Sequence, residues 1–185
     1  MRKIKCVFLF VNSLFLSCSV NSLSVKSEFQ IIQLEEFYSG QGAIIPATSI
    51  EYFGNDSTKF TPSIEQIKQA ELILKNDLHN HYWKDYYFGG FFYNESKDST
   101  ELYEEFEDQV NKYKTDLTYF NRYYLGYRNL INEVIIKIAV FDATSCESKE
   151  MFKNWQNKYY WYLGSYSEYM RNYEINLNDN DIEHF

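Results

Sequence analysis

The hydrophobic periodicity of this 185-residue chain changes at residue 119, and the change limits the folds open to it. Before residue 119, apolar residues recur at three- and four-residue intervals, which is typical of one face of an α-helix. After it, apolar and aromatic residues alternate or form short β-branched runs, which indicates strands. We therefore predict an α+β fold in which two helices are followed by an antiparallel sheet of about four strands.

The first helix is predicted over residues 62–80. Two N-terminal caps fit its start: Thr61 with Pro62 at the first helical position, or a capping box of Ser63 and Gln66. One stripe should be buried, and all of its members except the glutamate are apolar: Ile64, Ile67, Ala70, Glu71, Leu74 and Leu78.

The second helix is predicted to begin at the acidic cap Asp98-Ser-Thr-Glu101 and to end between residues 112 and 118. Acidic residues crowd its first turns, where the helix dipole favours them. Its buried stripe is expected to contain Leu102, Phe106, Val110, Tyr113 and Leu117.

A β-hairpin is predicted after the helices, with strands at 119–127 and 134–141 joined by the loop Asn129–Glu133. Earlier in the chain, residues 28–34 and 50–53 are weaker strand candidates. Residues 151–173 fit either a helical stripe or two strands that turn at Gly164-Ser165. Their aromatic density and short turn favour strands.

Eight of the thirteen residues 81–93 are Tyr, Trp or Phe. This run follows the predicted first helix, so we expect a surface connection divided by Gly89-Gly90. Its phenylalanines should cap the core, because they have no polar group. Trp83 and the tyrosines can form a half-exposed rim, because each joins an apolar ring to a polar atom.

The N-terminus resembles an export signal. Basic residues precede an apolar run that is too short to span a membrane and that ends at Cys18. Because Phe15-Leu-Ser-Cys18 loosely matches a bacterial lipobox, we predict a lipoprotein-type signal peptide at 1–18, lipidation of Cys18, a tether at 19–27 and a single domain at 28–185. Plain cleavage after residue 22 and secretion is the alternative.

The chain contains three cysteines, Cys6, Cys18 and Cys146. If Cys18 carries lipid, only Cys146 remains in the domain, so no disulfide framework is expected. The composition, rich in Asn, Lys, Ile, Tyr and Phe, indicates an AT-rich bacterial genome.

The charge of the chain argues against nucleic acid as a partner. Removing residues 1–17 takes away three basic residues and no acid, and the formal net charge changes from −8 to −11. An acidic domain repels phosphate backbones and disfavours direct contact with an anionic membrane surface. We therefore expect membrane contact only through the lipid anchor, in the cell envelope.

Four segments resemble a family of small secreted or lipoprotein-like bacterial proteins that is uncharacterised. The resemblance covers roughly residues 60–176 and rests on Ile67–Leu74 ("I..AE..L"), Leu117–Tyr127 ("Y.RQY.GY.N"), Ile136–Phe141 and Asn154-Trp155. Tyr123 departs from the pattern, which has Gln at this position, and so does the Gly-poor turn at 163–165. The resemblance implies an architecture, with a cystatin-like helix on a sheet as one option, and no particular activity.

Candidate catalytic residues are few. His79 and His81 have a metal-site spacing, but on a helix their rings point about 200° apart. Cys146 has acidic neighbours, which oppose a reactive thiolate. The sequence contains no phosphate-binding loop or nucleophile elbow. We predict no catalytic residue, metal or cofactor and favour a non-enzymatic protein, although a hydrolase with paired carboxylates stays open.

Arg122 lies among tyrosines, where it could stack on rings or grip a ligand carboxylate. A structural Arg–Glu pair on the outer sheet face is the favoured alternative. The predicted function is that of an exported interaction protein with a protein or glycan partner. In a glycan- or small-ligand-binding module, the binding residues would be Trp83, Tyr86, Tyr87, Arg122 and Trp161.

Overall fold

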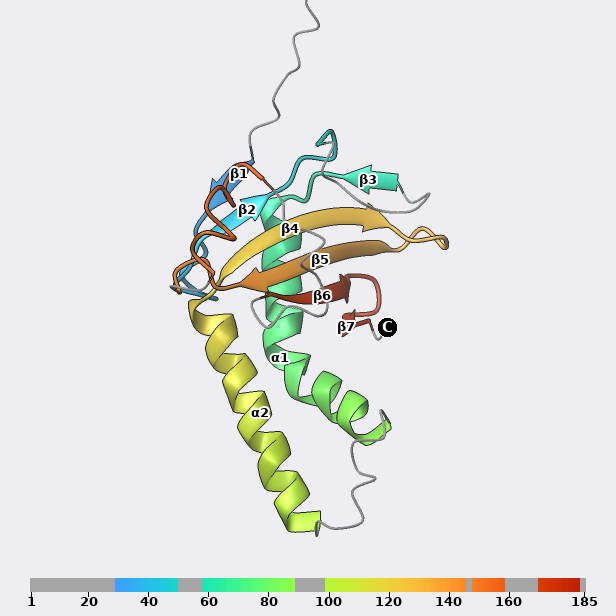
Figure 1. The fold of residues 1–185 in the computed structure, drawn as a ribbon. Coiled ribbons are helices and arrows are strands. Elements are labelled where there is room, and N and C mark those ends of the chain that lie inside the picture. The colour runs from blue at the N-terminus through green and yellow to red at the C-terminus, as the bar shows by residue number, and fades with distance from the viewer. Residues whose placement is uncertain (1–28, 50–57, 89–98, 146–147, 159–169, 184–185) are drawn as a thin grey trace, which may run out of the picture.

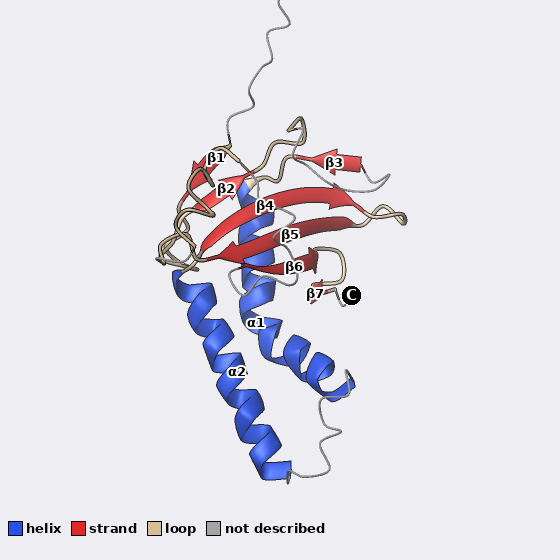
Figure 2. Ribbon diagram, viewed as in Figure 1, coloured by secondary structure: helices blue, strands red, loops and turns tan. Residues whose placement is uncertain are grey.

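The computed structural model describes residues 29–49, 58–88, 99–145, 148–158 and 170–183. Helices pack on one face of a twisted sheet, and the two helices extend beyond the sheet together (Figure 1). Figure 2, which is coloured by secondary structure, shows the helices and the sheet as separate layers. The elements are β1 (Gln30–Ile32), β2 (Gly42–Ile44), β3 (Thr58–Phe60), α1 (Ile64–Phe88), α2 (Ser99–Tyr119), β4 (Asn121–Arg128), β5 (Val134–Phe141), β6 (Met170–Asn176) and β7 (Asp181–Ile182).

The sheet has seven strands in the described part of the chain, in the order β1-β2-β4-β5-β6-β7, with β3 also paired to β4. Pairing is antiparallel except between β2 and β4, which are parallel. The α+β class is therefore confirmed. The predicted order and strand number are wrong in detail, because three short strands that precede the helices join the same sheet.

The β4–β5 hairpin is confirmed, with a register that runs from Asn121↔Phe141 to Arg128↔Val134. The predicted boundary is wrong by two residues, because α2 continues to Tyr119 and β4 begins at Asn121. Side chains alternate across β4: Tyr124 belongs to the core beneath α1, and Tyr123 belongs to the core on the opposite face. The sheet is thus covered on both faces. The core beneath α1 includes Ile67, Leu74, Leu78, Ile136, Ile138 and Ile175, and the opposite core includes Phe29, Ile45, Leu125, Phe141, Phe152 and Met170.

The first helix begins with the capping box and not with the Thr61-Pro62 cap. The backbone N–H of Ser63 donates to Oε1 of Gln66 at 2.9 Å, and the N–H of Gln66 donates to Oγ of Ser63 at 3.2 Å. Because each side chain satisfies the other residue's amide, the helix starts at Ile64. The predicted stripe is buried as expected, Glu71 included, with Ile64 only partly covered.

The aromatic run 81–93 is not a connection throughout, because α1 continues to Phe88. Aromatic residues have modest helix propensity, so tertiary contacts must extend the helix. The ring of Tyr82 stacks on Tyr113 of α2 with centroids 4.2 Å apart, and Trp83 contacts Phe106 edge-on at 5.0 Å. Docking on α2 therefore carries α1 beyond residue 80. Residues 89–93 lie outside the described residues.

Two of the other strand predictions are confirmed. The weak strand at 28–34 is confirmed as β1, and the strand predicted near the end of 151–173 is confirmed from Met170 onward. Residues 151–157 form turns. The predicted strand at 50–53 and residues 159–169 lie outside the described part of the chain.

Candidate functional site

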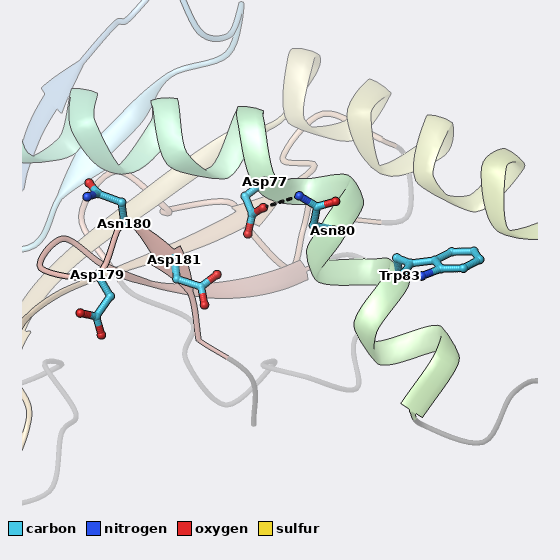
Figure 3. A pocket seen from close by; sticks show the side chains of 6 residues that line it. All are labelled: Asp77, Asn80, Trp83, Asp179, Asn180 and Asp181. Atoms are coloured by element: carbon cyan, nitrogen blue, oxygen red, sulfur yellow. Dashed lines mark hydrogen bonds between the residues drawn. The ribbon is translucent and has the colours of Figure 1, made fainter.

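A polar cleft opens between α1 and the turn that joins β6 to β7. Its volume is about 430 Å³, and it is lined by Asp77, Asn80, Trp83, Asp179, Asn180 and Asp181. In Figure 3, Asp77 and Asn80 on α1 lie across from the three residues of the turn. The cleft is therefore built from two segments that are about a hundred residues apart in the sequence.

One wall of the cleft is a single turn of α1. Asp77 and Asn80 are three residues apart and so share a helix face. Nδ2 of Asn80 donates to Oδ1 of Asp77 at 2.8 Å (Figure 3). This bond fixes the carboxylate and leaves the amide oxygen of Asn80 available as an acceptor.

The other wall is a turn stabilised by side-chain contacts. Oδ1 of Asn176 accepts the backbone N–H groups of Asn178 and Asp179 at 2.9 and 3.3 Å. Asn180 has a φ of 55°, a left-handed conformation that asparagine tolerates. Nε2 of Gln69 on α1 donates to Oδ1 of Asn180 at 3.3 Å, so the helix holds the turn directly.

The site is strongly acidic. Three aspartates line the cleft. Beside it, Nδ2 of Asn176 lies 3.0 Å from a carboxylate oxygen of Glu133 and 3.3 Å from oxygens of Asp179 and Glu183. Burial raises the pKa of Glu183, and the negative charges of Glu174, Glu133 and Asp179 raise it further. Such a surface favours ligands rich in hydrogen-bond donors.

Trp83, a predicted ligand-binding residue, closes the far end of the cleft along α1. Its ring packs between the helices, with its centroid 5.0 Å from that of Phe106 and 6.2 Å from that of Tyr103. In Figure 3 the ring points away from the aspartates. Trp83 is therefore held in place by α2 and offers the cleft an apolar border.

The other predicted ligand-binding residues are not brought to the cleft by any described contact. Tyr86 and Tyr87 lie on α1, beyond the residues whose side chains the structure describes. Trp161, like the lipidation candidate Cys18 and the loop residue Cys146, lies outside the described residues.

Arg122 forms a structural pair with a glutamate, the alternative favoured by the sequence. Its Nε donates to Oε1 of Glu71 at 2.8 Å. The pair is buried between β4 and α1, so the expected position on the outer sheet face is wrong. The guanidinium also lies 3.8 Å from the ring centroid of Tyr38, and no ligand can reach it without displacing α1.

The two histidines of the H-x-H motif lie on α1 and contact different neighbours. Nε2 of His79 lies 2.9 Å from Oε1 of Glu107 on α2, whereas His81 contacts the rings of Tyr82 and Tyr173. Among the described residues, no group of three or more His, Cys, Asp or Glu side chains has a metal-binding arrangement.

Comparison with protein-family models, with curated proteins and with solved structures gives no match. The resemblance to small secreted bacterial proteins and to a cystatin-like fold therefore stays a prediction. In the part of the chain that the structure describes, no helix has the length and apolar character needed to cross a membrane.

Sequence reasoning did not assign the turn residues of the site. Asn178-Asp-Asn-Asp181 is a dense run of residues that favour turns. That pattern predicts a turn, but not its position beside α1. The bond from Gln69 to Asn180 spans 111 residues, and no local pattern encodes it.

Proposed function

We propose that this chain is an exported, non-enzymatic binding protein, held at the cell envelope by a lipid on Cys18. Its ligand is a glycan or another small hydroxyl-rich molecule, bound in the cleft between α1 and the β6–β7 turn. The observation that carries this proposal is the lining of the cleft, where carboxylates and amides of α1 lie across from those of the β6–β7 segment.

The chemistry of the lining supports a hydroxyl-rich ligand. Each aspartate has two acceptor oxygens, and each asparagine can both donate and accept. Sugar hydroxyls do both as well. The volume of about 430 Å³ falls within the usual range of small-molecule sites.

The fixed geometry of the lining also supports selective binding. Asp77 is held by Asn80, and Oδ1 of Asp181 accepts the backbone N–H of Ile182 at 2.9 Å. Because these acceptors are already oriented, the side chains of the cleft would lose less conformational entropy on ligand binding than mobile side chains would.

The test is a glycan array with the full chain, followed by calorimetric titration of any glycan bound. We expect Asp181→Asn and Asn80→Ala to weaken binding at least tenfold, because the first replaces a charged acceptor oxygen by a donor and the second removes the amide. Asp108→Asn, on the exposed face of α2, is the matched control and leaves affinity unchanged. Trp83→Ala tests the apolar border, with circular dichroism as the check on folding.

Three results of this test would contradict the proposal. Absence of glycan binding together with capture of a specific protein partner would replace it with the protein-interaction hypothesis. Equal affinity in Asp181→Asn and wild type would place the ligand elsewhere. Release of cleaved sugar during the titration would identify a hydrolase.

Export and anchoring have their own test. Mass spectrometry of the chain purified from bacterial membranes should show a lipidated N-terminus at Cys18, and Cys18→Ser should release the protein from the membrane fraction. An unmodified N-terminus beyond residue 18 contradicts the anchor but leaves the cleft hypothesis intact.

A further inference from the structure

The tip of the β4–β5 hairpin exposes two adjacent aliphatic side chains. Leu130 is 94% exposed and Ile131 is 75% exposed, more than any other large apolar side chain in the described part of the chain. The hairpin projects past its neighbours at one end of the sheet (Figure 1). Contiguous exposed apolar residues commonly mark a contact surface.

The turn that carries them is held by hydrogen bonds. Oδ1 of Asn129 accepts the backbone N–H groups of Ile131 at 3.2 Å and Glu133 at 2.9 Å. Nη1 of Arg128 donates to the carbonyl oxygen of Asn132 at 3.0 Å, and Asn132 adopts a φ of 70°. Because these bonds fix the backbone, both aliphatic side chains are presented by a defined conformation.

The strand register places the N-terminal segment at the same end of the sheet. Gln30 pairs with Ile44, and Ile44 pairs with Tyr124. β1 is antiparallel to β2 and β2 is parallel to β4, so β1 runs opposite to β4. The chain before Gln30 therefore enters the sheet from the end toward which β4 leads, where Leu130 and Ile131 lie.

The distances along the sheet and the length of the tether allow the hairpin tip and the N-terminal anchor to reach the same membrane surface. Leu130 lies six residues beyond Tyr124, or roughly 20 Å along the strand direction, and β1 is two strands from β4, roughly 10 Å. The ten residues 19–28 can span up to roughly 35 Å. A domain anchored at residue 18 can therefore bring its hairpin tip to the surface that holds its anchor.

We propose that the hairpin tip inserts Leu130 and Ile131 into the lipid bilayer as a second membrane contact that orients the anchored domain. This inference rests on the proposed membrane attachment of the N-terminus. A convex tip with two aliphatic side chains suits a soft lipid surface, and each side chain favours the apolar phase roughly ten- to a hundredfold. The proposal replaces the expectation that the lipid anchor is the only membrane contact, and because the domain is acidic, it applies to a zwitterionic bilayer.

The test measures the depth of the tip in phosphatidylcholine vesicles. The mature chain, residues 18–185 with Cys18 and Cys146 replaced by serine, is attached through an N-terminal hexahistidine tag to a nickel-chelating lipid in the vesicles, so that membrane attachment does not depend on lipidation. A fluorophore is attached at Ile131→Cys or, as the matched control, at Leu72→Cys on α1, where the native side chain is 50% exposed. Nitroxide-bearing phosphatidylcholine serves as the quencher.

We expect quenching at position 131 to be several-fold stronger than at position 72. Adding Leu130→Ser to the chain labelled at 131 should bring its quenching down to the level of the control. Equal quenching at positions 131 and 72 overturns the proposal. Because mass spectrometry reports lipidation separately, failure of the anchor hypothesis is distinguishable from failure of tip insertion.

Discussion

The Nε atom of Arg122 on β4 donates a hydrogen bond to Oε1 of Glu71 on α1 at 2.8 Å, and the two side chains are 1% and 4% exposed. The same carboxylate oxygen accepts the hydroxyl of Tyr124 at 2.7 Å. Arg122 also donates to the carbonyl oxygens of Phe120 and Leu117, at the end of α2. One buried ion pair therefore joins both helices to the central strand.

Glu71→Ala should strongly destabilise the fold. It leaves the guanidinium of Arg122 buried without its carboxylate, which costs about 3–5 kcal/mol in the free energy of unfolding. Urea denaturation measures the change. Glu36→Ala, which breaks the exposed Lys68–Glu36 pair, is the control and should have little effect. A loss no larger than that of the control would show that the pair does not connect helix and sheet as we infer.

Gly40→Ala should destabilise the protein more than Gly126→Ala. A Cβ at residue 40 would lie 2.5 Å from the backbone oxygen of Phe120, which also binds Arg122 and cannot move alone. A Cβ at residue 126 would lie 2.6 Å from the ring of Phe60, which is only partly buried and can shift. We expect a cost of about 1–3 kcal/mol at residue 40. Equal unfolding midpoints for the two variants would contradict this ranking.

Stability should fall as the pH rises from 10 to 12. Burial raises the pKa of Tyr38 and of Tyr173 to about 12. The unfolded chain releases these protons near pH 10, so the folded state holds more protons above that pH and loses stability by about 1.4 kcal/mol per pH unit for each tyrosine. Urea unfolding between pH 8 and 12 measures the slope.

Tyr173→Phe should flatten this alkaline slope, because it removes one buried phenol. Tyr119→Phe is the control, since its ring is 64% exposed, and should leave the slope as in wild type. An alkaline slope that is the same in all three proteins would mean that Tyr173 does not contribute to it.

The contact between α1 and α2 should be visible in the titration of Glu107. The hydrogen bond from His79 is the largest influence that lowers the pKa of Glu107, and a hydrogen bond from Tyr103 is the next. In His79→Ala, the pKa of Glu107 should therefore rise toward its ordinary value, as followed by NMR. Tyr103→Phe should raise it less. If the pKa of Glu107 does not change in His79→Ala, the His79–Glu107 hydrogen bond does not contribute to the interface between the helices.

The helices and the hairpin could be predicted because their information is local. The stripe from Ile67 to Leu78 repeats with the helical period, and the Ser63–Gln66 box marks its start within four residues. Alternation likewise predicts strands on both sides of the Asn129–Glu133 loop. Even the burial of Glu71 follows from its place in an apolar stripe.

The site could be predicted only in part. Trp83 was a candidate because of its aromatic neighbours, yet the sequence does not show that α2 holds its ring. Asp179 and Asp181 lie in a recognisable turn, but their position beside Asp77 results from the β6–β7 pairing and the contact with Gln69. Contacts between residues so far apart have no local period that could predict them.

The sequence by itself determined the α+β class, the presence of the two helices, the β4–β5 hairpin and the acidic character of the chain, because spacing and charge act over a few residues. Only the tertiary structure decided that β1, β2 and β3 join the sheet, that α1 extends through its aromatic residues to Phe88, and that the glutamate paired with Arg122 is Glu71, buried beneath the helix. Those outcomes depend on which surfaces are buried together, since burial extends a weak helix and makes a charge require its partner.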